Sequence, residues 1–230
     1  AGFDPTTLAP AEAQYWMEAE AANDGDVDKQ VALARRYHTG EGVAQDYAAA
    51  ARWYQLAADQ GHSDAQVTLA GFYREGQGVP QEYAEAVRWH RAAAEQGGAV
   101  AQFTLGNRYA TGRGVPLDDI EAARWYQLAA EQGYDVAQYN LGVLYDIGRG
   151  LPQNDIQAMR WYRSAAEQGH ADAQWNLGVM YEAGVGVPQD YVAAYVWFSL
   201  SAAGRQNADR NRELVIRGRD RVAVSYTHLT

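Results

Sequence analysis

Hydrophobic and polar positions recur along this chain with a period of 36 residues. Five consecutive blocks superimpose without a gap, and they open at Gly25, Gly61, Gly97, Gly133 and Gly169. Inside the blocks the residue type is constant at positions that, in the third block, are Gln102, Leu105, Tyr109, Gly112, Gly114, Ala122 and Trp125. A fixed period of this length predicts a repeat architecture in which each block is one supersecondary unit.

Each block predicts two helices. In the second block, Ala65, Leu69 and Tyr73 place apolar side chains four residues apart, which forms a stripe along one helical face. Gly76 then ends this first helix, because glycine adopts the left-handed conformation of a helix cap at little cost. A stripe of alanine and tryptophan marks the second helix. Positive φ angles are therefore expected at the equivalent glycines Gly40, Gly76, Gly112, Gly148 and Gly184.

Polar residues near the expected helix starts predict side-chain caps. Ser63 and Gln66 have the spacing of a capping box at the start of a first helix. Asp118 and Glu121 have the same spacing at the start of a second helix. We therefore expect Ser63 and Asp118 to be N-cap residues.

Both ends of the chain depart from the repeat. Residues 1–24 are interpreted as an N-terminal arm and a capping half-repeat helix. Residues 25–204 form the five repeats, at 25–60, 61–96, 97–132, 133–168 and 169–204. Residues 205–230 begin like a further first helix, which predicts a C-terminal capping helix. The last six residues, Ser225–Thr230, fit nothing upstream and are either native or a non-native tail.

Composition and charge narrow the possible partners. The formal net charge is −10 and there is no run of Lys or Arg, so nucleic acid is not an expected partner. No stretch approaches the roughly 18 apolar residues of a membrane span, so no membrane insertion is expected. The absence of cysteine excludes disulfides and cysteine nucleophiles. The chain begins at Ala1 rather than Met, which a removed signal peptide or an artificial start would explain.

The run Ala137–Tyr145, followed by Gly148, Gly150 and Pro152, resembles the Sel1-like repeat, a relative of the tetratricopeptide repeat with a longer, glycine-bearing loop. The resemblance covers residues 25–204. It implies an all-α fold: a right-handed α-α superhelix, or solenoid, of five 36-residue helix-turn-helix repeats with terminal capping helices. It also implies a concave wall built by the first helices, and a role as an adaptor in complex assembly, signalling or bacterial envelope processes.

No catalytic residue, metal site or cofactor emerges from the motifs. The glycine pairs lack the third glycine of a dinucleotide fingerprint and the Gly-Lys-Ser/Thr of a P-loop. The five histidines lack paired ligand spacing. Lys29 is the sole lysine, so a Ser-x-x-Lys nucleophile motif is absent. We expect a non-enzyme, and a hydrolase that uses a carboxylate pair is the remotest alternative.

The invariant tryptophans allow two interpretations. Five indole rings in register would suit a sugar-stacking platform. However, Trp89 lies three and four residues from Ala86 and Ala93, so its ring fills the space that small residues leave on facing helices. We therefore interpret the tryptophan column, including Trp125, as core.

Candidate binding residues flank the invariant Leu and Tyr of the first helices, where the residue type varies. The predicted peptide-binding groove consists of Phe103, Asn107, Tyr139, Asn140, Val143, Trp175, Asn176 and Val179. Amides would hold the backbone of an extended peptide, and aromatic rings would take its side chains. The alternative is that the aromatic residues fill space between repeats, although their increase in size has no evident packing cause in the sequence.

These patterns favour a non-catalytic adaptor that binds a protein or peptide along the concave face. The alternative from another class is a carbohydrate- or peptidoglycan-binding protein of the bacterial envelope that uses the same aromatic groove. A periplasmic or secreted bacterial location is expected, with the cytoplasm as the alternative. A signal peptide in the precursor would discriminate between these locations.

Overall fold

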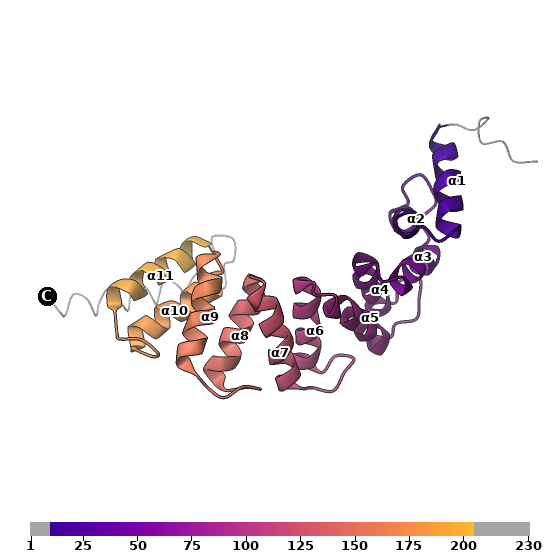
Figure 1. Cartoon of the computed structure of the whole chain (residues 1–230). Coiled ribbons are helices and arrows are strands. Elements are labelled where there is room, and N and C mark those ends of the chain that lie inside the picture. The colour runs from indigo at the N-terminus through magenta and orange to yellow at the C-terminus, as the bar shows by residue number, and fades with distance from the viewer. Residues whose placement is uncertain (1–9, 205–230) are drawn as a thin grey trace, which may run out of the picture. The chain divides into compact units, whose positions relative to one another are not determined.

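The structure is a computed structural model, and it describes residues 10–204. This range holds eleven helices and no strand, as the repeat pattern predicts (Figure 1). The helices are α1 (Pro10–Asn23), α2 (Val27–Thr39), α3 (Tyr47–Asp59), α4 (Ser63–Glu75), α5 (Tyr83–Glu95), α6 (Ala99–Thr111), α7 (Asp119–Glu131), α8 (Asp135–Ile147), α9 (Asp155–Glu167), α10 (Ala171–Ala183) and α11 (Tyr191–Gly204). The expected arm at residues 1–9 and the expected cap at residues 205–230 lie outside the described residues.

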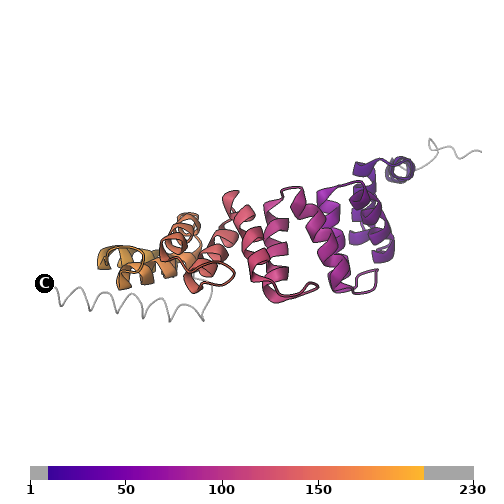
Figure 2. The same ribbon diagram turned by 60° about the horizontal axis from the view of Figure 1, so that its bottom comes forward.

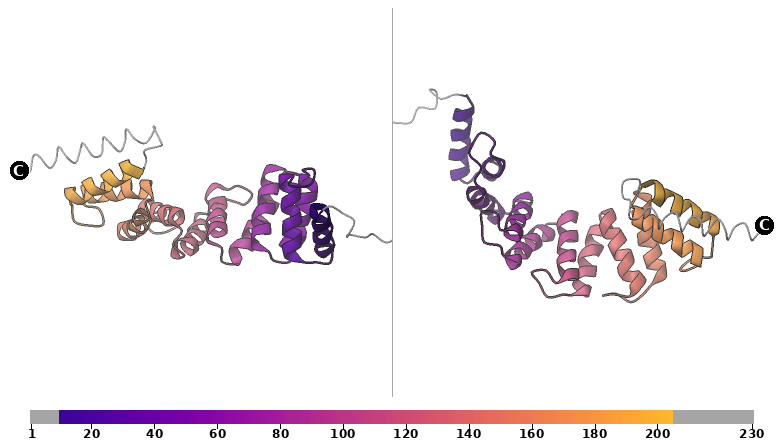
Figure 3. Two further views of the ribbon diagram at one scale, coloured as in Figure 1. Left: turned by 90° about the horizontal axis from the view of Figure 1, so that it is seen from above. Right: turned by 180° about the vertical axis from the view of Figure 1, so that it is seen from behind.

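The helices form two compact units, one up to Leu117 and one from Asp118. In the first unit, each helix from α1 to α5 packs against the helix that follows it, and in the second unit each helix from α7 to α10 does so (Figures 2 and 3). Even-numbered helices from α2 to α10 are the first helices of the repeats, and odd-numbered helices from α3 to α11 are the second helices. Each unit is therefore a row of stacked helix pairs.

The glycines that end the first helices adopt the predicted geometry. The φ angles at Gly40, Gly76, Gly112, Gly148 and Gly184 lie between 66° and 77°. The second invariant glycine of the loop has a steric reason as well. A Cβ atom at Gly150 would lie 2.2 Å from the carbonyl oxygen of Asp119, because the loop rests on the start of the preceding second helix. Only glycine permits this approach.

The predicted cap at Asp118 is confirmed, and the predicted cap at Ser63 is wrong. Asp118 accepts hydrogen bonds from the backbone nitrogens of Ile120 and Glu121, as expected. Ser63, however, is the first helical residue of α4, and the N-cap is His62, whose Nδ1 accepts from the backbone nitrogen of Ala65 at 3.2 Å. Ser63 starts the helix one residue too late to cap it.

Gln66, the glutamine of the expected capping box, does not cap the helix. It forms hydrogen bonds to neighbouring helices, which the sequence did not predict. Gln66 is buried, and its Nε2 donates to the carbonyl oxygen of Ala58, at the end of the preceding helix, at 3.1 Å. Its Oε1 accepts from Nε2 of Gln96 at 2.8 Å. Corresponding bonds to the preceding helix recur at Gln30, Gln102, Gln138 and Gln174. The invariant glutamine therefore joins successive repeats, and through Gln30 it joins α1 to α2.

Small side chains and one leucine per repeat form the core. Leu33, Leu69, Leu105, Leu141 and Leu177 are almost completely buried. Alanine pairs on the second helices let neighbouring helices approach closely. The tryptophan column is core only in part: Trp89 and Trp125 are 5% and 7% exposed, whereas Trp53, Trp161 and Trp197 are only partly buried.

Candidate functional site

The eight residues of the predicted groove lie on three first helices. Phe103 and Asn107 are on α6 of the first unit, where both are partly buried. The other six belong to the second unit and are called the first-helix wall here: Tyr139, Asn140 and Val143 on α8, and Trp175, Asn176 and Val179 on α10. Five of these six are partly buried, and Val179 is 37% exposed. The wall is thus neither core nor free surface.

The two aromatic rings of the wall are each packed on one side. The ring of Tyr139 stacks on His170, with 4.6 Å between the ring centroids, and lies 5.9 Å from the ring of Tyr162. The ring of Trp175 lies 4.7 Å from that of Phe198. Space-filling therefore accounts for part of this column, and the packing holds both rings in place while leaving them partly exposed.

The increase in ring size along this column has a packing cause. A Cβ atom at Gly142 would lie 2.7 Å from the ring of Tyr162, and one at Gly178 would lie 2.7 Å from the ring of Phe198. The first two repeats carry alanine at these positions. Glycine lets the second-helix ring approach the first helix, and that ring is the surface against which the large residues of the wall pack.

A hydrogen-bonded phenol links the two helices of the wall. The hydroxyl of Tyr162 on α9 donates to Oδ2 of Asp146 on α8 at 3.0 Å, and it also hydrogen-bonds to the side chain of Asn176 on α10. Burial, followed by the negative charge of Asp146, raises the pKa of Tyr162. The phenol therefore stays protonated and fixes the side chain of Asn176 at the wall.

The first helices differ in charge between the two units. Those of the first unit carry the basic residues Lys29, Arg35, Arg36, Arg74 and Arg108. Those of the second unit, α8 and α10, contain no Lys or Arg and carry Asp135, Asp146, Asp172 and Glu182. The first helices of the first unit also carry Asp28, Asp64 and Glu75, so the two units differ in that the helices of the first-helix wall have acidic residues without basic ones.

His90 occupies the position that the other repeats give to Tyr or Phe. It is 4% exposed, and neither ring nitrogen has a hydrogen-bond partner. Burial, together with the positive charges of Arg108 and Arg74, lowers the pKa of His90 to about 4. The imidazole is therefore neutral at pH 7, and it is a poorly satisfied core residue rather than a metal ligand.

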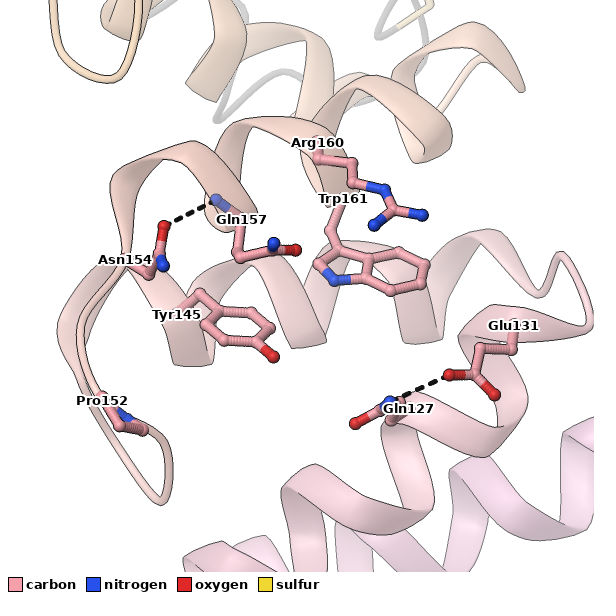
Figure 4. A pocket seen from close by; sticks show the side chains of 8 residues that line it. All are labelled: Gln127, Glu131, Tyr145, Pro152, Asn154, Gln157, Arg160 and Trp161. Atoms are coloured by element: carbon pink, nitrogen blue, oxygen red, sulfur yellow. Dashed lines mark hydrogen bonds between the residues drawn. The ribbon is translucent and has the colours of Figure 1, made fainter.

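A cavity of about 430 Å³ lies on the second-helix side of the second unit. It is called the second-helix pocket here, and its lining residues are Gln127 and Glu131 of α7, Tyr145 of α8, Pro152 of the loop, and Asn154, Gln157, Arg160 and Trp161 at the start of α9 and along it. Figure 4 shows the rings of Tyr145 and Trp161 and the Gln127 side chain around the opening. Sequence reasoning assigned Trp161 to the core and missed this pocket.

Two hydrogen bonds hold polar side chains of the pocket in position (Figure 4). Nε2 of Gln127 donates to Oε1 of Glu131 at 2.9 Å. Oδ1 of Asn154 accepts from the backbone nitrogen of Gln157 at 3.0 Å, which caps α9. The guanidinium carbon of Arg160 lies 5.5 Å from the centroid of the Trp161 ring, within the range of a cation–π contact. The pocket combines aromatic rings with amides and one charge of each sign.

Five consecutive matches to the model of the Sel1 repeat cover residues 30–62, 63–98, 99–134, 135–170 and 171–204. The chain belongs to the Sel1 repeat family. Sel1 repeats generally mediate protein interactions, and the solenoids that they build are generally non-catalytic. The comparison with proteins of curated function finds no match.

Solved Sel1 structures from bacteria share the fold. A protective antigen present in uropathogenic Escherichia coli strains is 38% identical over 82% of this chain and 40% of its own, with a TM-score of 0.76. A Sel1 repeat protein from Oxalobacter formigenes is 33% identical over 88% of this chain and 58% of its own, with a TM-score of 0.75. The chain thus spans less than two thirds of either relative.

Two further properties of residues 10–204 bear on metal binding and membrane insertion. Within residues 10–204, no group of three His, Asp or Glu side chains is placed to hold a metal ion. No helix in that range is both long and apolar enough to cross a bilayer.

Proposed function

We propose that this Sel1 solenoid is a non-catalytic scaffold that binds an extended segment of a partner protein along its first helices. The first-helix wall is the proposed docking site in the second unit. The observation that carries the proposal is the state of Tyr139 and Trp175, which are held on one side by other rings yet remain partly exposed. Aromatic anchors that are already fixed lose little conformational entropy on binding, which is typical of hot spots.

The amides of the wall suit a peptide backbone. Asn176 uses one hydrogen bond on Tyr162, and a side-chain amide has two N–H donors and one acceptor oxygen, so capacity remains for a ligand. Asn140 precedes the invariant Leu141 as Asn176 precedes Leu177, which gives one amide per repeat. An extended peptide offers backbone donors and acceptors at regular intervals. Phe103 and Asn107 are the proposed groove residues of the first unit.

The charge of the second unit indicates the kind of segment that would bind there. The four acidic residues of α8 and α10, without any Lys or Arg on these helices, favour a segment that carries basic as well as apolar side chains. Binding of such a segment should weaken as the salt concentration rises, because exposed charges are screened. A saccharide site is expected to combine aromatic rings with neutral hydrogen-bonding side chains and no net charge. The second-helix pocket has this composition, and the acidic first-helix wall does not.

Site-directed photo-crosslinking tests the proposal. A photo-reactive amino acid at Val179, which is 37% exposed, should capture a partner whose crosslinked peptide mass spectrometry can identify. The same amino acid at Ile156 on α9, which is 69% exposed, is the matched control. The identified peptide is then synthesised, and its affinity is measured against the wild type and the Val179→Lys variant.

The expected result is a loss of affinity of about 1–4 kcal/mol in Val179→Lys, with an unchanged melting temperature. A peptide that crosslinks equally at both positions, or that binds the variant as tightly as the wild type, would refute the first-helix wall as the docking site. Tyr139→Ala is less informative on its own, since the loss of its packing on His170 and Tyr162 also lowers stability.

We also propose that the protein acts in the bacterial periplasm or outside the cell. Both Sel1 relatives are bacterial, and one is described as a protective antigen. Fractionation of the source organism with an antibody against the solenoid tests the location, and recovery only in the cytoplasm would contradict it.

A further inference from the structure

The second-helix pocket differs from the corresponding places in the other repeats at two positions. The first is Gln127. Arginine occupies this position in two other repeats, where Arg91 hydrogen-bonds to the hydroxyl of Tyr109 and Arg163 to that of Tyr181. Gln127 is shorter and is hydrogen-bonded to Glu131 on its own helix instead. The space beside the hydroxyl of Tyr145, which an arginine fills elsewhere, is left open (Figure 4).

The second differing position is Gln157. The equivalent Glu85 and Glu121 form ion pairs with Arg88 and Arg124, one turn further along the helix. Gln157 cannot form such a pair, and the ion pairs among residues 10–204 do not include Arg160.

The loss of this ion pair coincides with a more exposed tryptophan. The ion-paired Arg88 lies 4.5 Å from the centroid of the Trp89 ring, which is 5% exposed. Arg160 lies further from the Trp161 ring, at 5.5 Å, and Trp161 is only partly buried. The corresponding place between α3 and α5 shares the glutamine of the first position, Gln55, but it keeps the Glu85–Arg88 pair. Among these places in residues 10–204, only the one between α7 and α9, beside Trp161, has glutamine at both positions.

We infer that the second-helix pocket binds a neutral sugar ring of an oligosaccharide. The partly exposed indole of Trp161 and the ring of Tyr145 offer aromatic surface for the C–H face of a pyranose. The amides of Gln157 and Asn154 and the hydroxyl of Tyr145 each contain donors and acceptors, as vicinal sugar hydroxyls require. Glu131 and Arg160 balance in charge, so the pocket selects neither an anion nor a cation. Its volume of about 430 Å³ falls within the range of ligand sites and suits one or two sugar rings.

This site is independent of the proposed peptide docking. The pocket is lined by second helices and by Tyr145, and none of its residues belongs to the first-helix wall. A partner protein and an oligosaccharide would therefore occupy different faces of the second unit. The position-specific changes at Gln127 and Gln157 carry the inference, so it stands even if the first-helix wall binds nothing.

An array of neutral hexose and N-acetylhexosamine oligomers, followed by calorimetric titration of the best binders, tests the inference on the intact chain. Three variants decide the site. Trp161→Ala removes the stacking surface. Gln127→Arg introduces the residue that other repeats hold at this position, and it should fill the space and bond to Tyr145. Gln157→Glu should pair with Arg160, as Glu85 pairs with Arg88.

We expect at least one neutral oligomer to bind the wild type, and each variant to lose about tenfold or more in affinity. Gln127→Arg is the decisive variant, because it copies natural Sel1 positions and should leave the melting temperature unchanged or higher. Val179→Lys is the matched control and should bind the oligomer as the wild type does. The inference is overturned if no array member binds the wild type better than Trp161→Ala, if Gln127→Arg retains full affinity, or if only tetragalacturonate, an acidic probe, binds.

Discussion

The two units of this solenoid use the same repeat positions with different chemistry. In the first unit, the aromatic position of the second helix holds Tyr54 and then His90, and basic residues lie on the neighbouring first helices. In the second unit it holds Tyr126, Tyr162 and Phe198, beside acidic residues, amides and glycines. Tyr162 is fully satisfied by Asp146 and Asn176, whereas both nitrogens of His90 are unpaired.

This contrast between the units shows which positions the scaffold constrains. The glutamine that joins the repeats, the core leucine and the loop glycines are identical in both units. The glutamine bonds to the preceding helix, the leucine is buried, and the loop glycines have a left-handed backbone. The aromatic position of the second helix holds a ring in every repeat. The polar group on that ring, a phenol, an imidazole or none, differs with the neighbouring residues. Variation of charge between the units is therefore compatible with an unchanged fold.

The largest expected effect separates a buried from an exposed tryptophan. Trp89→Ala in the first unit should destabilise the protein by about 3–5 kcal/mol, since it empties a large core site. Trp161→Ala in the second unit should cost clearly less, because that ring is only partly buried. Urea unfolding of both variants measures the difference, and equal losses would show that Trp161 is core and that the pocket is not open.

The second prediction concerns His90 and acid. Because its folded pKa of about 4 lies below the usual value of 6.5, the unfolded chain binds the proton first. Stability should therefore fall as the pH is lowered from about 6.5 to about 4, by about 3 kcal/mol from this residue. The positive charges of Arg108 on α6 and Arg74 on α4 oppose protonation of His90 in the folded protein.

His90→Tyr isolates this effect, since it restores the residue found at the position in three other repeats. The difference in unfolding free energy between the variant and the wild type should be larger at pH 4 than at pH 7.5. A difference that does not change with pH would mean that His90 is not the buried neutral group described above.

The third prediction exchanges a small residue between the units. Gly142→Ala should destabilise the second unit by about 1–3 kcal/mol, because the added methyl group would lie 2.7 Å from the ring of Tyr162. In the first unit the equivalent positions hold Ala70 and His90, so that repeat combines a methyl group with a smaller ring. A neutral or stabilising Gly142→Ala, as helix propensity alone would predict, would mean that Tyr162 does not need glycine above it.

Much of the fold could be predicted from the sequence because the repeat acts as its own alignment. The glycine φ angles and the helix order follow from a constant period. The cap at Ser63 was wrong because His62, one residue earlier, also accepts a hydrogen bond and precedes the first helical turn. The role of Gln66 was missed because its bonds reach the preceding and following helices, which local spacing cannot show.

The candidate sites were less predictable, for a physical reason. The positions of Tyr139 and Trp175 were found because they vary beside constant ones, but their packing on His170 and Phe198 depends on side-chain conformations. The second-helix pocket had a signal in the sequence, namely glutamine at Gln127, where two other repeats hold Arg, and at Gln157, where two other repeats hold Glu. The sequence alone does not show that the arginine and glutamate of other repeats form the Arg91–Tyr109 hydrogen bond and the Arg88–Glu85 ion pair. These contacts are what the two glutamines replace.

The smallest expected effect tests whether the satisfied phenol of the second unit serves binding rather than stability. Tyr162→Phe keeps the ring and its packing but removes the hydrogen bonds to Asp146 and Asn176. The cost should be about 0.5–1.5 kcal/mol, because Asp146 is partly exposed and water can replace the phenol. Asn176 would then lose its fixed orientation, so the affinity for the crosslinked peptide should fall more than the stability does. Tyr54→Phe in the first unit is the matched control, since Tyr54 bonds to Arg35 instead. Equal losses of peptide affinity in Tyr162→Phe and Tyr54→Phe would show that the phenol of Tyr162 has no specific role in peptide binding.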